Sequence, residues 1–217
     1  GVSSGFGDPN NDASRWTSAG GMLSVGMFGG GYSIAYDWDS DGSVVVGDIT
    51  GAFNDHAFRW TVAGGLEDLG RMTGGNGSRG RGVSADGSTV VGWGSTGITG
   101  VRAFRWTSAG GMVSLGTLAG RASLAYGVSG NGQVVVGVLM SPNAAMLWTS
   151  SLGMVDLNAY LPTLGINLTG WALTTANGVS GDGLTLVGTG THNGLTEAWV
   201  AHLPSPTPGG GVPDGGD

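Results

Sequence analysis

Four aspartates within one short stretch have the residue types and spacing of a calcium-binding loop. Asp37, Asp39 and Asp41 occupy alternate positions, Gly42 follows, and Asp48 is the twelfth residue counted from Asp37. Calcium loops carry oxygen ligands at positions 1, 3, 5 and 12 and a glycine at position 6, where the chain turns sharply. The flanking segments have strand patterns, and an aspartate at the last position reaches less far than a glutamate. We therefore weigh a calcium site against an acidic hairpin turn, and the sequence favours the turn.

Three tryptophans fall outside the positions at which tryptophan recurs along the chain. They are Trp38, Trp93 and Trp171. An aromatic ring on a protein surface offers a flat apolar face on which a sugar ring can stack. These three residues are therefore the candidates for a glycan site, whereas the recurrent tryptophans are expected to fill the core.

The composition removes several kinds of chemistry. The chain has no cysteine, so disulfides, thiolate nucleophiles and Cys-ligated zinc are excluded. It also has no lysine, which excludes Schiff-base catalysis. His56, His192 and His202 lack the spacing of metal ligands, and the chain contains no Gly-x-Ser-x-Gly nucleophile motif. The sequence predicts no catalytic residue and no cofactor other than calcium.

The charge and apolar content limit the partners of the protein. The net charge of −7 disfavours nucleic acid, because affinity for nucleic acid depends on neutralising phosphates. No segment reaches the roughly 18 apolar residues that a transmembrane helix needs. The 47 glycines lie at turns between apolar runs, which is typical of tight connections.

The elements that position these side chains belong to one unit that recurs along the chain. Its turn glycines are Gly42, Gly87, Gly132 and Gly183, at steps of 45, 45 and 51 residues. An aromatic segment follows each turn, and one copy precedes the first turn, so the pattern begins halfway through a unit. The aromatic segments occupy residues 13–17, 57–61, 103–107, 145–149 and 198–201.

Each unit is predicted to form four short strands. In the unit around Gly87, residues 82–84 end the first strand, and Asp86-Gly87 is the pair that a type I′ hairpin prefers. Four strands in about 45 residues is the size of one propeller blade. The second strands, such as Val44-Val45-Val46, do not alternate between apolar and polar residues. They must therefore be covered on both faces, as they are between stacked blades.

We predict an all-β fold, a β-propeller-like array of four-stranded blades with about four and up to five blades. Residues 1–11 are expected to be a lead or an added edge strand, 12–203 the repeat domain, and 204–217 a flexible Pro/Gly-rich tail. The half unit at the start and the incomplete unit at the end are expected to close the ring between the N- and C-termini. Residues 12–17 and 197–202 both resemble third strands, so the spare strand is predicted to pair with another molecule.

A second pattern couples arginines to turns. Arg59 and Arg105 precede the recurrent tryptophan in units whose turns carry Asp41 and Asp86, and the arginine and the turn aspartate are lost together in the next unit. We predict that each arginine lies near the aspartate of its own unit. By the same argument Arg15 should face the turn of the last unit across the closure.

The repeat resembles a known family. The likeness is carried by His56-Ala57-Phe58 with the Arg-Trp-Thr that follows, by Gly-Gly-Met and Leu-Gly downstream, and by Gly-Val-Ser-x-Asp-Gly-x-x-Val-Val-Gly. Over roughly residues 12–202 the chain resembles the HAF family of extracellular repeat proteins of bacteria. Residues 212–216 resemble the start of a C-terminal sorting signal of the VPDSG or PEP type, without the apolar helix and basic cluster that complete it. These resemblances imply an exported or cell-surface protein and no catalytic residues.

The sequence thus favours a non-enzymatic extracellular protein with a structural or adhesive role, one that self-assembles into fibres by strand exchange. Its expected partners are further copies of itself or components of the cell surface and matrix. The alternative is a carbohydrate-binding propeller that uses Trp38, Trp93 or Trp171. A propeller hydrolase is the weaker alternative, because no cluster of Asp, Glu or His recurs at one end of the units.

Overall fold

The computed structural model describes residues 2–3, 12–26, 31–50, 55–97 and 100–204. Nearly all of these residues form strands or tight turns. Most of the predicted lead segment 1–11, and all but the first residue of the predicted tail 204–217, lie outside the described residues. Within the lead, a short strand at residues 2–3 pairs with the first repeat strand.

Within the described residues, eighteen strands form five antiparallel sheets, three of them four-stranded and two three-stranded. In spatial order the strands are β1 (Val2–Ser3), β2 (Ser14–Thr17) and β3 (Gly21–Ser24); β4 (Tyr32–Trp38), β5 (Val44–Thr50), β6 (His56–Thr61) and β7 (Gly65–Asp68); β8 (Ser78–Val83), β9 (Thr89–Ser95), β10 (Val101–Thr107) and β11 (Gly111–Ser114); β12 (Ser123–Val128), β13 (Val135–Leu139), β14 (Ala144–Thr149) and β15 (Gly153–Asp156); and β16 (Trp171–Val179), β17 (Thr185–His192) and β18 (Leu195–His202). The all-β, propeller-like prediction is confirmed, with five sheets. We number the sheets one to five along the chain.

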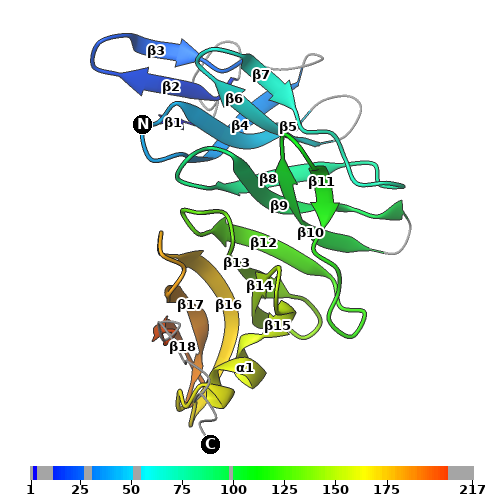
Figure 1. The fold of residues 1–217 in the computed structure, drawn as a ribbon, viewed down its shortest axis with the longest axis vertical. Coiled ribbons are helices and arrows are strands. Elements are labelled where there is room, and N and C mark those ends of the chain that lie inside the picture. The colour runs from blue at the N-terminus through cyan, green and yellow to red at the C-terminus, as the bar shows by residue number, and fades with distance from the viewer. Residues whose placement is uncertain (1, 4–11, 27–30, 51–54, 98–99, 205–217) are drawn as a thin grey trace, which may run out of the picture.

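The sheets follow one another along the molecule, so that the first and the fifth lie at opposite ends (Figure 1). The half-unit closure predicted between the termini is not formed in the described part of the chain. Instead β2 pairs with β1 and β3, and β18 pairs with β17 alone. The physical reason is local, because the strands of each terminal sheet pair with neighbours close in sequence rather than with each other. The array therefore stays open.

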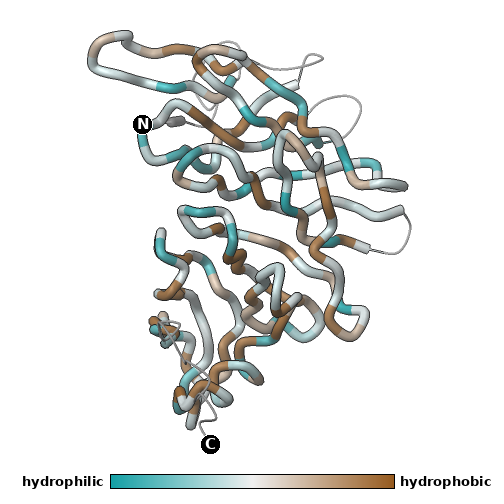
Figure 2. Tube along the Cα trace, viewed as in Figure 1, coloured by the Kyte–Doolittle hydropathy of each residue, from teal (hydrophilic) through white to brown (hydrophobic). Residues whose placement is uncertain are grey.

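The valine-rich second strands hold consecutive sheets together, as the sequence predicts. Val45, Val46, Val90 and Val91 are fully buried. Adjacent residues point to opposite faces of a strand: Val46 packs in one cluster with Val90 of the next sheet, and Val91 packs with Val135 of the sheet after that. Burying one such side chain contributes about 1.5 to 3 kcal/mol. Apolar stretches accordingly recur from sheet to sheet along the trace (Figure 2).

A glycine five residues after each turn glycine lets the first and second strands of a sheet approach closely. At Gly92, an added Cβ would lie 1.8 Å from the carbonyl oxygen of Arg79. Gly47, Gly137 and Gly188 meet first-strand carbonyls at 1.9 to 2.0 Å. In each sheet this glycine lies beside a β-bulge in the first strand. No side chain fits at this position, which explains why the unit repeats a glycine there.

The predicted arginine–aspartate pairs within single units are wrong. The Nε atoms of Arg15, Arg59 and Arg105 donate hydrogen bonds to turn-glycine carbonyls of the following unit, at 2.6, 3.0 and 3.0 Å. The acceptors are Gly42 O, Gly87 O and Gly132 O, respectively. The arginine stands on the third strand, and its side chain faces the next sheet. Each arginine therefore joins two consecutive sheets, and Arg15 contacts the second sheet rather than the last.

The turn aspartates act inside their own turns instead. Asp86 Oδ1 accepts hydrogen bonds from the Ser84 hydroxyl and the Ser88 backbone N–H, and these bonds lower the pKa of its carboxyl to about 2. Asn131 accepts the equivalent pair from Ser129 and Gln133. An amide oxygen serves this turn as well as a carboxylate, so the loss of the aspartate has no connection with the loss of the arginine.

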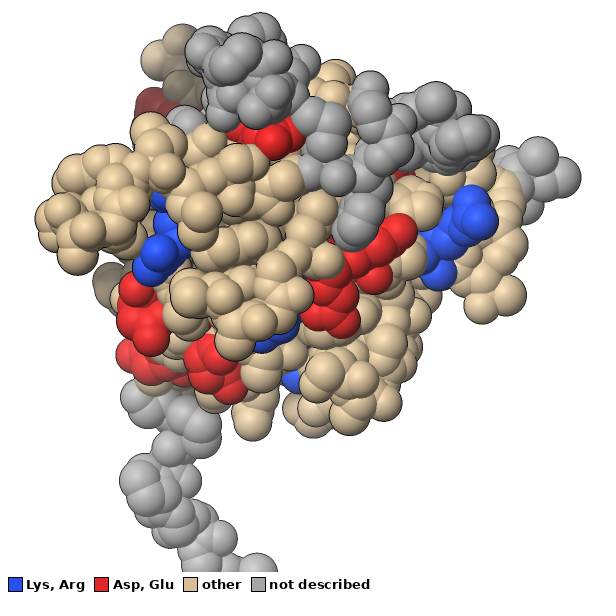
Figure 3. Space-filling view, turned by 90° about the horizontal axis from the view of Figure 1, so that it is seen from above, with Lys and Arg blue, Asp and Glu red and all other residues tan. Residues whose placement is uncertain are grey.

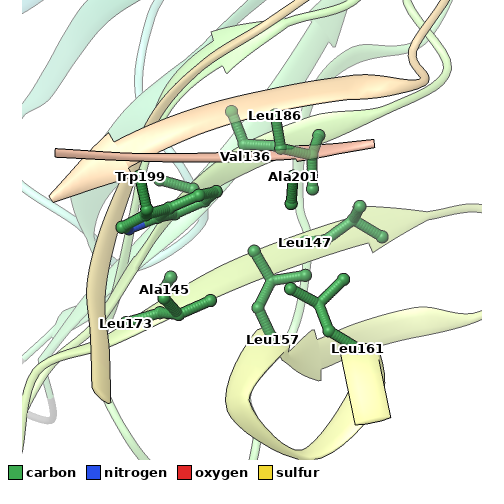
Figure 4. Packing of buried hydrophobic residues seen from close by; sticks show 10 residues of the cluster. Val136, Ala145, Leu147, Leu157, Leu161, Leu173, Leu186, Trp199 and Ala201 are labelled. Carbon is green, nitrogen blue, oxygen red and sulfur yellow. The ribbon is translucent and has the colours of Figure 1, made fainter. Parts of the chain in front are cut away.

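A short helix follows the fourth sheet, in the stretch that lengthens the last step of the repeat to 51 residues. Helix α1 (Leu157–Thr163) begins at Asp156, whose side chain accepts a hydrogen bond from the Asn158 backbone. Leu157 and Leu161 are fully buried in the cluster between the fourth and fifth sheets (Figure 4). Among the described residues, no helix has the length and apolar character needed to cross a membrane.

Replacing Gly92 with alanine is expected to destabilise the fold by about 3 kcal/mol or more, because the new methyl group would collide with backbone that cannot move aside. The matched control is Gly181→Ala, where an added Cβ meets nothing within 4 Å and the second unit of the sequence already carries Ala85. Urea unfolding should show little change for this control. Equal stability of the two variants would contradict the close approach.

Arg105→Ala is expected to cost about 1.5 to 3 kcal/mol, because it removes charged hydrogen bonds to Gly132 O and Thr89 Oγ1. Arg102→Ala is the control, since among the described residues Arg102 donates only to the carbonyl of the adjacent Val101. Chemical denaturation of both variants measures the difference. A loss of the same size in both would show that the bond between sheets has no special role.

Candidate functional site

One position of the repeat places a side chain outside the strand ladder on the first strand of the second to fifth sheets. This position lies six residues before the turn glycine and is the extra residue of the β-bulge. Its occupants are Tyr36, Arg81, Tyr126 and Asn177. A bulge residue is unpaired in the strand ladder, so its type is free to vary. Variable side chains on a fixed backbone make this position a natural place for a binding surface.

Three of these side chains, together with Trp93 of β9, join three sheets through ring contacts. The Arg81 guanidinium lies 3.5 Å from the centroid of the Tyr36 ring and 4.3 Å from that of Trp93. Trp93 in turn meets Tyr126 edge to face, with ring centroids 5.9 Å apart. Cations over aromatic faces are attracted by the ring quadrupole. We call Tyr36, Arg81, Trp93 and Tyr126 the aromatic row.

A buried carboxylate fixes Arg81 in the aromatic row. Asp48 accepts hydrogen bonds from Arg81 Nη1 at 2.8 Å and from the Gly80 backbone N–H at 2.9 Å. Arg79 Nη1 lies 3.9 Å from the same carboxylate. Burial raises the pKa of Asp48 to about 6, although the two arginines and the Gly80 N–H oppose that shift. The side chain of Arg81 therefore has little freedom, and it holds one face of Trp93 in place.

A cleft of about 210 Å³ opens beside Trp93, where β8 begins, β9 ends and β10 begins. The side chains that line it include Asp55, Asn76, Arg79, Trp93 and Ser95. Arg79 is ion-paired with Asp55, and the Ser95 hydroxyl donates to Asn76 Oδ1 at 2.7 Å. The cleft thus combines one aromatic wall with several hydrogen-bonding groups, the usual make-up of a small-ligand site.

The four aspartates of the expected calcium loop are engaged separately by protein donors. Asp37 Oδ2 accepts from the Val83 backbone, Asp39 from the Val44 backbone and the Ser43 hydroxyl, and Asp41 from the Ser43 backbone. Asp48 is held by Arg81. Within the described ranges, no three His, Asp or Glu side chains are grouped to hold a metal ion. In the structure these aspartates accept hydrogen bonds from the chain itself, and calcium binding by them stays a prediction.

The three tryptophans singled out by the sequence lie in three separate places. Trp38 is half exposed beside Arg15 and Asp41, between the first and second sheets. Trp171 stacks on His192 with ring centroids 4.4 Å apart and lines a cleft of about 240 Å³ beside α1. Of the three, Trp93 belongs to the aromatic row, and the structure does not bring the three candidates together in one site.

Sequence reasoning missed Tyr36, Arg81 and Tyr126. A signal for them exists in the repeat, because aligning the units on their turn glycines shows a position with changing occupants between positions that stay constant. The alignment does not show the β-bulge, which leaves the residue at this position unpaired in the strand ladder. Asp48 is a calcium candidate by its spacing, and in the structure it is ion-paired with Arg81 of the next unit, a contact that spacing within one unit does not indicate.

Comparison with known proteins bears on the fold alone. The sequence matches no family model and no curated protein. The structure is similar to TolB from Acinetobacter baumannii, with a TM-score of 0.61 and 12% identity over 93% of this chain and 49% of that chain. For a protein named as TolB from Agrobacterium tumefaciens, the TM-score is 0.56 and the identity 15%, and the match covers 93% of this chain and 69% of that chain. For a prolyl endopeptidase structure, the TM-score is 0.53 and the identity 9%, and the match covers 90% of this chain and 31% of that chain.

The chain therefore spans about half the length of the first of these structures. At such low identities the likeness supports a propeller-like arrangement of sheets and carries no activity with it.

The raised pKa of Asp48 predicts a specific pH dependence of stability. An acid whose pKa is about 6 in the folded state and 3.8 in the unfolded chain binds its proton more tightly when folded. The cost of burying the charge is present above pH 6 and is relieved as the pH falls. Lowering the pH from 7 to 5 should therefore raise the free energy of unfolding by about 1 kcal/mol through Asp48.

The measurement is chemical denaturation at several pH values for the wild type and Asp48→Asn. The variant cannot titrate at this position, so subtracting its profile removes the contributions of the histidines and other carboxylates. Parallel profiles would show that Asp48 stays ionised across this range.

Proposed function

We propose that the protein is a non-enzymatic structural or adhesive component of a bacterial cell surface, and that its copies associate end to end. The resemblance of its repeat to extracellular HAF proteins supports the location. The open array of sheets supports the association.

The carrying observation is that the end sheets expose positions that interior sheets bury. Val46, Val91 and Val136 stand four residues after their turn glycines and are fully buried, whereas the equivalent Val187 of the fifth sheet is 41% exposed. Its cross-strand partner Val200 is 62% exposed. Hydrophobic groups that recur in one packing role, and are left in water at one end, mark an unfinished interface.

The opposite end carries the complementary half of the same interface. In the interior sheets, the recurrent tryptophan faces the preceding sheet, and Trp60 and Trp106 are buried there. The equivalent Trp16 of the first sheet is 51% exposed, and its cross-strand partner Met22 is 63% exposed. Seen from above this end, most of the visible described surface is uncharged (Figure 3).

Packing the fifth sheet of one copy on the first sheet of another would repeat the contact already made between consecutive sheets. Such a head-to-tail contact builds a ring if the rotation closes and a filament if it does not. Strand exchange stays a second route. β6, β10 and β14 are each covered by a fourth strand, whereas among the described strands β18 has no outer neighbour.

The test is light scattering over a wide range of protein concentrations, with electron microscopy of the same samples. We expect concentration-dependent assembly, and Val187→Asp should weaken it at least about tenfold, a change of about 1.4 kcal/mol. The matched control is Val113→Asp, because Val113 is 55% exposed on an interior sheet. A monomer at every concentration, or equal weakening by both variants, would overturn the proposal.

A further inference from the structure

We infer that the cleft beside Trp93 binds a neutral carbohydrate. At about 210 Å³ the cleft is smaller than the roughly 300 to 1,000 Å³ of pockets that take drug-sized ligands. It suits a small ring or the end of a glycan chain. The cleft lies where β8 begins, β9 ends and β10 begins, three strands that are labelled in Figure 1.

Trp93 is preorganised as a platform. Arg81 lies over its ring and Tyr126 abuts it edge to face, while Arg81 is itself held by Tyr36 and Asp48. A ring fixed on several sides loses little side-chain entropy when a ligand binds. Trp93 lines the cleft, and the indole face that Arg81 does not cover attracts the weakly positive C–H groups of a sugar, by the same quadrupole that attracts cations.

The polar groups of the cleft are oriented toward a ligand rich in hydroxyl groups. The Ser95 hydroxyl donates to Asn76 Oδ1 and accepts from the Asn76 backbone at 2.8 Å. With Oδ1 engaged, the Asn76 side chain presents its amide NH₂ as a donor. Asp55 adds a carboxylate acceptor and Arg79 adds guanidinium donors. A sugar hydroxyl both donates and accepts, so it can use each of these groups.

The charges of the cleft favour a neutral ligand over an anionic one. Arg79 is ion-paired with Asp55 and lies 3.9 Å from the buried Asp48, so two carboxylates surround its positive charge. An acidic sugar or a phosphate would have to compete with these carboxylates. A neutral sugar instead accepts from the guanidinium without disturbing the ion pair.

Two residues of the cleft differ in type from the residues at the equivalent positions of the neighbouring sheets. Arg79 and Trp93 face each other across β8 and β9. The equivalent pairs in neighbouring sheets are Ile34 with Asp48 and Leu124 with Val138. An exposed cation beside an aromatic ring thus replaces side chains of other kinds at one sheet only. A binding role accounts for this pair.

The experiment probes the purified full chain with an array of neutral and acidic glycans, followed by calorimetric titration of those that bind. We expect a neutral glycan to bind, Trp93→Ala to reduce its affinity at least tenfold, and Asn76→Ala to reduce it severalfold. Trp38→Ala is the matched control, because Trp38 is half exposed outside the cleft. It should bind as the wild type does.

Asn76→Ala alters a side chain at the surface and keeps the test valid if Trp93→Ala fails to fold. Light scattering of the same variants separates this site from end-to-end association, since neither residue lies in a terminal sheet. Binding of no neutral glycan at millimolar concentration, a preference for acidic glycans, or an equal loss in Trp38→Ala would overturn the inference.

Discussion

The structure depends on the packing of one valine-rich strand per unit between two neighbouring sheets. Each second strand is apolar on both faces, so a single sheet cannot bury it. Val46 and Val91 reach zero exposure only because the next sheet supplies the opposite wall. Stability is therefore shared between neighbours, as in other repeat arrays, and a sheet without a following neighbour leaves Val187 in water.

The same repeated geometry creates both rigidity and variation. The glycine beside each bulge lets two strands approach until no side chain fits, which fixes the backbone. The bulge then releases one residue from the ladder, and that residue differs from unit to unit: Tyr36, Arg81, Tyr126 and Asn177. Arginines between sheets add a second constraint through the turn carbonyls. A constant frame carrying a variable position is how loop and edge residues acquire binding roles on a stable scaffold.

The two proposals concern different parts of the molecule and are independent physically. End-to-end association uses apolar positions left over from the packing of sheets, so it follows from the open array. Carbohydrate binding uses a polar and aromatic cleft on an interior sheet, whose rigidity comes from Asp48 and Arg81. A surface protein that forms multimers would present many such clefts, and weak single sites then combine into strong attachment.

The sequence by itself determined the repeat, the strands of each unit and the doubly buried second strand. These features depend on residues close together in the chain, through strand periodicity, turn chemistry and local hydrogen bonds. It also named Trp93 as a binding candidate. Only the tertiary structure decided that Arg59 and Arg105 contact the following unit, that the first and fifth sheets do not pair, and that Arg81 joins Asp48 to Trp93. These contacts link different sheets, and the spacing within one unit carries no information about which neighbour a side chain faces.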